Sequence, residues 1–389
     1  MTAVSDIVII GAGIVGTACA RECAARGLTT TVVDAAGIGG GATAAGMGHI
    51  VVMDDSPMQL ALTRYSQQLW RELSLQLPGN VEFDPCGTLW VASDEEEMGE
   101  VRRKQALYAS VGVSSEILDS HALAEAEPHL RPLFGALLVP SDAVIYPPCA
   151  AGYLLRDAVR MGARLLAPHR VVSAGAGRVQ LEDGTILQAA YIVNASGVDA
   201  VRLLPGLPIR KRRGHLVITD RYPGFVRHQL VELGYLKSAH SIATDSVAFN
   251  VQPRRTGQLL IGSSREYGAE TSSVNHALLA AMVARAQGYL PTIGDLQSIR
   301  VWTGFRAATP DKLPLIGPWP DDKTLFLATG HEGLGITTSL ATAKLLVATL
   351  LGEPAAIPAE PYFPARFLQE RNADSAEAHP VSAPEEFHV

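Results

Sequence analysis

Three glycines and an aspartate near the start of the chain have the spacing of a nucleotide phosphate site. The apolar run Ile7–Ile10 predicts a strand, and Gly11, Gly13 and Gly16 open the helix that follows it. The first glycine permits the tight turn, the second lets a pyrophosphate approach the backbone, and the third lets helix and strand pack closely. Asp34 lies 23 residues after Gly11, at the end of the next predicted strand, where a carboxylate accepts a hydrogen bond from a ribose hydroxyl. This segment is therefore predicted to bind a dinucleotide, with the pyrophosphate at the helix N-terminus.

A second glycine-rich segment follows Asp34 and ends at a histidine. Residues 37–49 contain six glycines in thirteen positions, a density that indicates either backbone close to a ligand or a flexible loop. His49 is a candidate to line the ligand pocket, although a lone histidine is more often satisfied by its own surroundings.

The elements that position these residues fall into two groups. Strands and helices alternate near the start of the chain, whereas strands dominate from Lys211 to about Ile261. We expect an α/β, two-domain protein in which a discontinuous Rossmann-like domain is combined with a second domain built on a mostly antiparallel sheet. Nicotinamide dehydrogenases usually have a contiguous cofactor domain, so this interruption disfavours that class. The expected bounds are 1–80, 140–205 and 300–352 for the first domain, 81–139 and 206–299 for the second, and 353–389 for a proline-rich tail.

Composition and charge argue for an ordinary globular enzyme. The chain has 389 residues, of which 47% are hydrophobic and 18% charged, and its net charge is −7. We expect no nucleic-acid partner, and interpret the basic run Arg210–Arg213 as a solvated or subunit-facing edge. The apolar stretch Thr338–Leu351 is too short to span a bilayer and is interrupted by Lys344, so no integral membrane segment is expected. Because the first strand begins at residue 6, no signal peptide is expected and the predicted location is cytoplasmic.

The four cysteines do not form a disulfide framework or a metal site. Cys19 and Cys23 are four residues apart on the first predicted helix, where small thiols are expected to pack in the core. Without a Cys-x-x-Cys cluster the chain is expected to hold no iron–sulfur centre of its own.

Four groups of segments, in this order, are similar to one enzyme family. They are Gly11–Gly16 with Asp34, Thr43–Gly46, Val193–Gly197, and Gly304–Asp311 with Pro314–Gly317 and Gly330–Gly335. Together they resemble the D-amino-acid oxidase superfamily of flavoproteins, which includes glycine oxidase, sarcosine oxidase and proline dehydrogenase β-subunits. The resemblance runs from residue 6 to about Phe367. Two further stretches, Ala44–Asp55 and Cys86–Trp90, are similar to the FAD subunits assigned to D-hydroxyproline dehydrogenases.

The resemblance implies that FAD binds non-covalently. Gly333 and Gly335 precede the last helix, whose free amides would face the flavin ring, where the positive end of the helix dipole favours negative charge. His331 is expected to position the backbone and not to act in catalysis. The residues expected to contact FAD are Gly11, Gly13, Ile14, Val15, Gly16, Asp34, Ala35, Gly41, Ala42, Thr43, Ala45, Gly46, Met47, Gly48, Val172, Ala195, Ser196, Gly197, Gly304, Arg306, Gly330, His331, Gly333, Leu334, Gly335, Ile336 and Thr337.

The resemblance also implies that Arg306 binds the substrate carboxylate, a task that suits the forked guanidinium group. The alternative is an arginine that bridges two strands. Two positions depart from the family: Ala307 stands where a proline is usual, and Asn250 lies near a tyrosine position of glycine oxidases. Asn250 and His49 are candidate catalytic residues, with a structural role for Asn250 about equally expected.

The implied activity is FAD-dependent oxidation of the carbon–nitrogen bond of a small amino or imino acid, with cis-4-hydroxy-D-proline as the expected substrate. The implied partners are iron–sulfur and flavin- or NAD-linked subunits. Two alternatives remain: a glycine, D-amino-acid or sarcosine oxidase that uses oxygen, and a non-catalytic flavin-bearing subunit of an electron-transfer complex.

Overall fold

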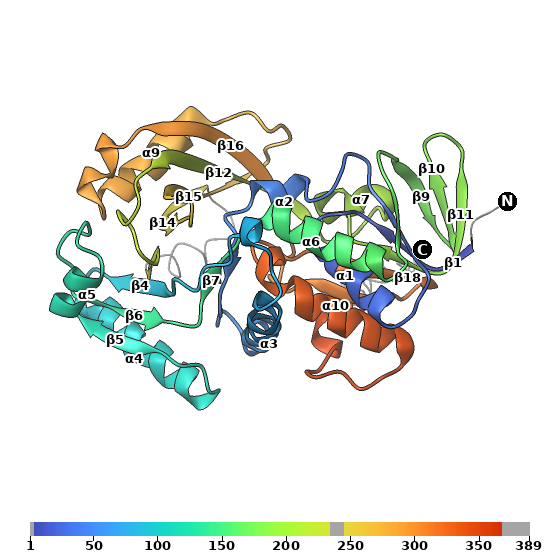
Figure 1. Cartoon of the computed structure of the whole chain (residues 1–389), viewed down its shortest axis with the longest axis horizontal. Helices are drawn as coiled ribbons and strands as arrows, with labels where there is room; N and C mark the ends of the chain where they lie inside the picture. The colour runs from blue at the N-terminus through green and yellow to red at the C-terminus, as the bar shows by residue number, and fades with distance from the viewer. Residues whose placement is uncertain (1–3, 234–244, 368–389) are drawn as a thin grey trace, which may run out of the picture.

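The computed structural model describes residues 4–233 and 245–367, and it contains two large β-sheets with helices packed around them (Figure 1). The sheet that holds the N-terminal strand and the sheet that holds β4, β14 and β16 lie toward opposite ends of the long axis. This architecture confirms the expected mixed α/β fold class.

The first sheet has parallel central strands, as a dinucleotide-binding fold requires. Its order is β17-β18-β11-β1-β2-β8, with the β9–β10 hairpin attached to β11, and every pair from β18 to β8 is parallel. The strands are β1 (Val4–Ile10), β2 (Thr30–Val33), β8 (Arg164–Leu166), β9 (Val171–Gly175), β10 (Arg178–Leu181), β11 (Ile186–Asn194), β17 (Leu315–Trp319) and β18 (Asp322–Thr329).

The continuous apolar run of β1 results from burial of both its faces. Ile7 and Ile9 pack into a core shared with helices α1, α6 and α10, whereas Val8 and Ile10 pack against the β9–β10 hairpin. The helices are α1 (Ile14–Ala25), α2 (Gly41–Ala45), α3 (Pro57–Ser74), α4 (Glu95–Ser110), α5 (Ser120–Ala126), α6 (Pro147–Arg160), α7 (Ala200–Leu203), α9 (His276–Gln287) and α10 (Gly335–Leu351).

The second sheet is antiparallel except for the pair β13·β4, as expected. Helix α9 covers one of its faces, where Phe249 and Val251 of β14 are buried against Met282. The alternate residues of its strands face the other way. The order is β16 (Ser298–Ala308), β12 (Arg210–Arg221), β15 (Gln258–Tyr267), β14 (Ser246–Pro253), β13 (Gln229–Glu232), β4 (Thr88–Ala92), β6 (Gly135–Val139) and β5 (Glu116–Asp119).

The expected domain boundary at residue 300 differs from the structure. Strand β16 pairs with β12 over its whole length and therefore belongs to the second sheet as far as Ala308. The chain returns to the first sheet only at Leu315. Gly304 and Arg306 thus reach the site from the second sheet, which the local sequence pattern did not reveal because strand pairing is a long-range property.

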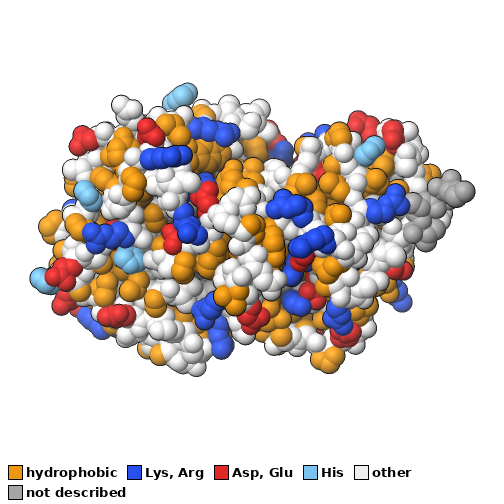
Figure 2. Space-filling view, in the orientation of Figure 1, with side chains coloured by type: hydrophobic (Ala, Val, Ile, Leu, Met, Phe, Trp, Pro, Cys, Tyr) orange, Lys and Arg blue, Asp and Glu red, His pale blue; other side chains and the backbone are white. Residues whose placement is uncertain are grey.

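The basic run Arg210–Arg213, expected to be a solvated or subunit-facing edge, is solvated only in its first half. It opens β12, an interior strand between β16 and β15. Arg212 and Arg213 are each 7% exposed, and they form ion pairs with Glu332 and Glu266. The expectation was wrong for these two arginines, which are buried and each have a carboxylate partner, whereas Arg210 is exposed and Lys211 is partly exposed. Elsewhere, positive and negative side chains are interspersed over both halves of the face in Figure 2.

The first part of the proline-rich tail packs on the body of the molecule. It includes the helical turn Glu360–Tyr362, and the Tyr362 hydroxyl donates to the carbonyl of Met58 at 2.7 Å. Residues 368–389 lie outside the described range. Among the helices of the described residues, none combines the length and apolarity that a membrane span requires.

Substitution of Gly16 tests the helix–strand contact of the first sheet. A Cβ at Gly16 would lie 1.9 Å from the carbonyl oxygen of Gly11, so we expect Gly16→Ala to destabilise the fold by about 1–3 kcal/mol and to lower the flavin content. Gly99, exposed in the interior of α4 with open space around it, provides the control. Gly99→Ala should stabilise the protein by up to about 1 kcal/mol. Thermal unfolding of both variants measures the difference, and equal midpoints would contradict the close contact.

Candidate functional site

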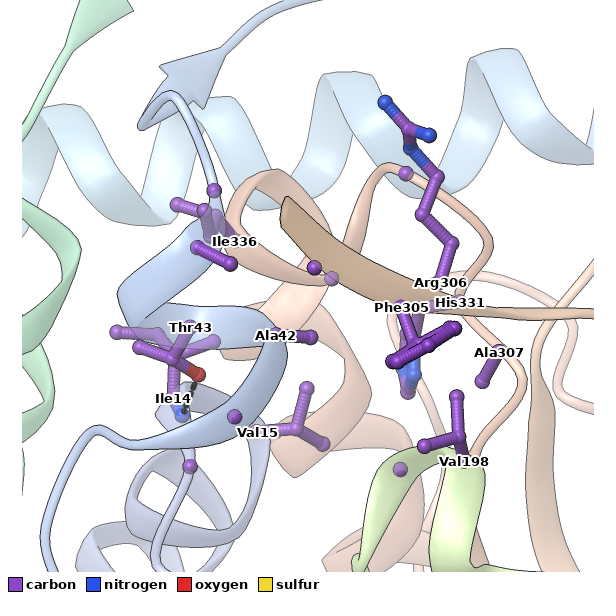
Figure 3. A pocket seen from close by; sticks show the side chains of 18 of the residues that line it. Ile14, Val15, Ala42, Thr43, Val198, Phe305, Arg306, Ala307, His331 and Ile336 are labelled. Carbon is purple, nitrogen blue, oxygen red and sulfur yellow. Dashed lines mark hydrogen bonds between the residues drawn. The ribbon is translucent and has the colours of Figure 1, made fainter. Parts of the chain in front are cut away.

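A cavity of about 580 Å³ lies where the two sheets meet. It is bounded by the ends of β1, β2 and β11, by the N-termini of α1 and α10, and by one face of the second sheet. Figure 3 shows Ile14, Val15 and Thr43 on one side of this cavity and Arg306 projecting from β16 on the other. The crevice beyond the carboxyl ends of parallel strands is where nucleotides bind in such sheets.

The start of α1 provides the phosphate cradle that the glycine spacing predicted. Gly11 has φ +110°, and a Cβ there would lie 2.6 Å from the carbonyl oxygen of Ala195. Gly13 is the N-cap of α1 and provides no side-chain cap. The amide of Ile14 donates to Thr43 Oγ at 2.9 Å, which fixes the second glycine-rich loop against the helix start (Figure 3). These residues therefore fit a pyrophosphate group held by backbone amides.

Asp34 lines the cavity and has a second task that sequence reasoning missed. Its Oδ2 accepts from the amide of Ala12 at 2.7 Å, inside the glycine turn, and its Oδ1 accepts from the amides of Ala36 and Gly37, each at 2.8 Å. The carboxylate thus ties the two loops that border the nucleotide site, in addition to its expected contact with a ribose hydroxyl.

The N-terminus of α10 also faces the cavity. Gly333, Gly335 and Ile336 line it, and the first turn of the helix has no side-chain cap and no acidic residue. His331 Nε2 lies 3.0 Å from Thr342 Oγ, and burial lowers the pKa of His331 to about 3, so this histidine is neutral. It ties the glycine turn to α10, consistent with the positioning role that we expected. The free amides of α10 favour a negative charge at this end of the cavity.

Arg306 occupies space that only a glycine on the neighbouring strand leaves open. A Cβ at Gly214 would lie 2.4 Å from its Nη1, and Nη1 donates to the carbonyl of Ser264 at 2.9 Å. The side chain therefore lies across β12, reaches β15 and lines the cavity. The guanidinium thus bridges strands, as the alternative interpretation of the sequence expected, and it also lines the cavity.

His49 and Asn250 line the same cavity with buried polar atoms. His49 Nε2 and Asn250 Oδ1 have no hydrogen-bond partner in the described part of the chain. Burial lowers the pKa of His49 to about 4; a hydrogen bond to Gln252 opposes this shift, and the positive charge of Arg306 adds to it. His49 is therefore neutral at physiological pH.

Most of the predicted site residues line the cavity, and three do not. Val172 of β9 is 48% exposed, because strand alternation turns it outward while its neighbour Val171 faces the cavity. Gly16 packs behind the phosphate cradle, against Gly11. Thr337 donates through Oγ to the carbonyl of His49 at 2.8 Å and so holds the loop. Those that line the cavity are Gly11, Gly13, Ile14, Val15, Asp34, Ala35, Gly41, Ala42, Thr43, Ala45, Gly46, Met47, Gly48, His49, Ala195, Ser196, Gly197, Asn250, Gly304, Arg306, Gly330, His331, Gly333, Leu334, Gly335 and Ile336.

Sequence reasoning missed several polar residues of the cavity wall. Thr88 and Trp90 of β4 line it, as do the paired Arg212 and Glu332. The spacing of two residues between Thr88 and Trp90 indicates that their side chains lie on the same face of a strand. It does not indicate whether that face lines the ligand cavity.

The two roles of Asp34 can be tested by its removal. We expect Asp34→Ala to weaken FAD binding by roughly 1–3 kcal/mol, because a buried hydrogen bond to a charged group is lost. Asp34→Glu should do less harm, since glutamate also accepts from hydroxyls. Asp183→Ala, at an exposed turn with a similar bond to the amide of Thr185, is the control. Flavin titration of the apoprotein measures the affinity, and an unchanged value in Asp34→Ala would refute the assignment.

The comparisons with known proteins agree with this geometry. The model of the family described as DAO, FAD dependent oxidoreductase, matches residues 6–349. A glycine oxidase of Pseudomonas aeruginosa is 26% identical over 92% of this chain and 98% of its own length. The hydrogen cyanide synthase subunit HcnC of the same species is 26% identical over 94% of this chain and 97% of its own.

Solved structures share the fold as well. The crystal structure of glycine oxidase from Geobacillus kaustophilus superposes with a TM-score of 0.84 at 24% identity, covering 93% of this chain and 98% of that one. These matches confirm the resemblance and the cofactor inferred from the sequence. The chain belongs to the DAO family of FAD-dependent oxidoreductases.

Proposed function

We propose that this enzyme oxidises the carbon–nitrogen bond of a small amino or imino acid, and that its substrate is cis-4-hydroxy-D-proline. The observation that carries the proposal is Arg306, a cation on the substrate sheet that borders the cavity beside the flavin segments. The relatives named glycine oxidase support an amino acid as the substrate class. The similarity of Ala44–Asp55 and Cys86–Trp90 to D-hydroxyproline dehydrogenase subunits supports the particular substrate.

In this proposal the residues of the cavity bind the substrate and orient it relative to the flavin. FAD, when bound, supplies the acceptor for the two electrons removed from the substrate. Arg306 holds the substrate carboxylate and thereby fixes the reacting carbon relative to the flavin site. His49 is neutral and adds no charge that would repel or bind the amine. Since the neutral amine assists the reaction with its own lone pair, no side-chain base is required.

The electron acceptor separates the proposal from its main alternative. The relatives named glycine oxidase support oxygen as the electron acceptor of this enzyme. The relative that is named as a subunit of hydrogen cyanide synthase supports a partner chain as the acceptor. We propose a dehydrogenase that passes electrons to iron–sulfur and flavin- or NAD-linked partner subunits.

The carboxylate assignment is tested at Arg306. Arg306→Ala should weaken substrate binding by about 10- to 150-fold, as expected for a lost charge-assisted hydrogen bond, with normal flavin content. The substrate affinity of Arg306→Lys should lie between those of wild type and Arg306→Ala, because lysine keeps the positive charge but cannot bind the carboxylate with two parallel hydrogen bonds. Arg300→Ala removes an exposed arginine from the same strand and is the control. Anaerobic titration of flavin bleaching measures the affinity; normal saturation in Arg306→Ala contradicts the assignment.

The acceptor is tested on the wild-type chain alone. Once reduced by substrate, the flavin should reoxidise slowly in air and faster with an artificial dye. Stopped-flow absorbance with a peroxide assay separates the two acceptors. Rapid peroxide formation would show that the enzyme is an oxidase. Bound flavin that no amino or imino acid bleaches would show that the chain is a non-catalytic subunit.

The attachment of FAD is tested by acid. None of the four cysteines lines the cavity, and His49 packs in a strand pair with Val144. We therefore expect acid precipitation to release the yellow colour into the supernatant. Colour that remains with the pellet would indicate a covalent bond, with His49 as the first residue to examine by peptide mapping.

A further inference from the structure

Six residues of the cavity wall have a buried polar atom without a hydrogen-bond partner in the described ranges: His49, Thr88, Trp90, Arg212, Asn250 and Glu332. Two of them, Trp90 and Asn250, are paired with the same residue of β13. Trp90 is 2% exposed and Asn250 is 8% exposed, and both line the cavity. Trp90 Nε1 and Asn250 Oδ1 form no hydrogen bond within the described ranges. A buried donor or acceptor left unpaired costs about 1–3 kcal/mol, so a pair of them at a ligand cavity indicates that the ligand supplies the missing partners.

The strand register brings these two residues onto one row of the second sheet. Val231 of β13 is paired with Trp90 of β4 on one side and with Asn250 of β14 on the other. All three residues line the cavity, so their side chains share one face. Adjacent strands are about 4.8 Å apart, which places the outer two backbones roughly 10 Å from each other. The apolar side chain of Val231 separates the indole from the amide.

The chemistry of the pair selects one kind of group. An indole N–H only donates, and the amide oxygen of asparagine only accepts. A hydroxyl group can accept from the first and donate to the second. A carboxylate has no proton for Asn250, and an ammonium group has no lone pair for Trp90. A neutral amine has both, but in an α-amino or imino acid it is bonded to the carbon that carries the carboxylate, so the Arg306 contact holds it away from this pair.

A buried cation holds the indole ring in place. The Lys104 ammonium, which is fully buried and ion-paired with Asp54, lies 4.6 Å from the centroid of the Trp90 ring. A cation over an aromatic face is attracted to it, and it withdraws electron density from the ring, which strengthens the indole N–H as a donor.

The distance to Arg306 fits a small ring. Its guanidinium reaches Ser264 on β15, and β14 and β13 follow in the sheet. The middle of the Trp90–Asn250 pair lies two strands from β15, or about 10 Å across the sheet. Ser264 is two residues along β15 from Gly262, the partner of Asn250, which adds about 7 Å along the strand. The separation is therefore about 12 Å, and a hydrogen bond of about 3 Å at each end leaves about 6 Å, which a small ring with its carboxylate can span.

We propose that Trp90 and Asn250 form a subsite for a hydroxyl group of the substrate, on the far side of a small carbon skeleton from the carboxylate that Arg306 holds. This inference rests on the proposed function and specifies it: the enzyme selects hydroxylated amino or imino acids. Trp90 and Asn250 determine that selectivity.

The test compares an inert carboxylate with its two hydroxylated isomers. Cyclopentanecarboxylate and the cis and trans isomers of 3-hydroxycyclopentanecarboxylate cannot be oxidised at a carbon–nitrogen bond, so the holoenzyme reports their binding through its flavin spectrum. Wild type should bind one hydroxylated isomer about 3- to 10-fold more tightly than the plain acid. Trp90→Phe and Asn250→Ala should each bring this ratio near one. Trp319→Phe, which removes an indole N–H that does not line the cavity, should keep the wild-type ratio. Flavin content and melting temperature confirm folding.

Each outcome decides the matter. No preference for either isomer in wild type, or an undiminished preference in both variants, overturns the hydroxyl subsite while Arg306-dependent binding of the plain acid leaves the proposed function standing. If no carboxylate perturbs the spectrum and no amino or imino acid bleaches the flavin, the proposed function fails, and the subsite fails with it.

Discussion

The close approach of three backbone segments behind the phosphate cradle is the constraint on which the site depends. Gly11 at the end of β1, Gly16 in α1 and Ala195 after β11 lie so near to one another that a single methyl group at either glycine would collide with a carbonyl oxygen. Because nothing separates them, α1 begins directly beyond the sheet and its first amides face the cavity. Helix α10 packs against α1 and begins at the same cavity, so two helix N-termini converge on one anionic ligand.

A second close contact sets the substrate sheet on the cofactor loops. Cβ atoms at Gly304 and Ala45 would be 2.3 Å apart, so β16 lies directly on α2. Arg306 follows two residues later on the same strand. The position of the proposed carboxylate-binding group is thus determined by a backbone contact, and its guanidinium is held by a carbonyl of a neighbouring strand. Such support from rigid elements is what orientation of a small substrate requires.

The sequence predicted the cofactor half of the site well, because that half depends on local order. A strand, a glycine turn and a helix follow one another within a few residues, and Asp34 ends the next strand. The substrate half depends on pairing between distant strands. Trp90, Val231 and Asn250 come together only through the register of β4, β13 and β14, which no local pattern encodes.

The same limit explains the two errors of position. Gly304 and Arg306 were expected in the first domain because their motif is continuous with the flavin-facing glycines, yet β16 pairs with β12. The basic run beginning at Arg210 was interpreted by charge alone, whereas an interior strand buries Arg212 against Glu332. In both cases the neighbour that decides the outcome is remote in sequence.

The contact between Gly214 and the Arg306 guanidinium links the residue types that these two positions can hold. Any side chain at Gly214 would displace the guanidinium from its path across β12, so residues 214 and 306 are not free to vary independently. Among related chains, an arginine in this orientation should be inherited together with glycine on the neighbouring strand. Position 214 can therefore indicate, from sequence alone, whether a relative is able to place an arginine over this sheet.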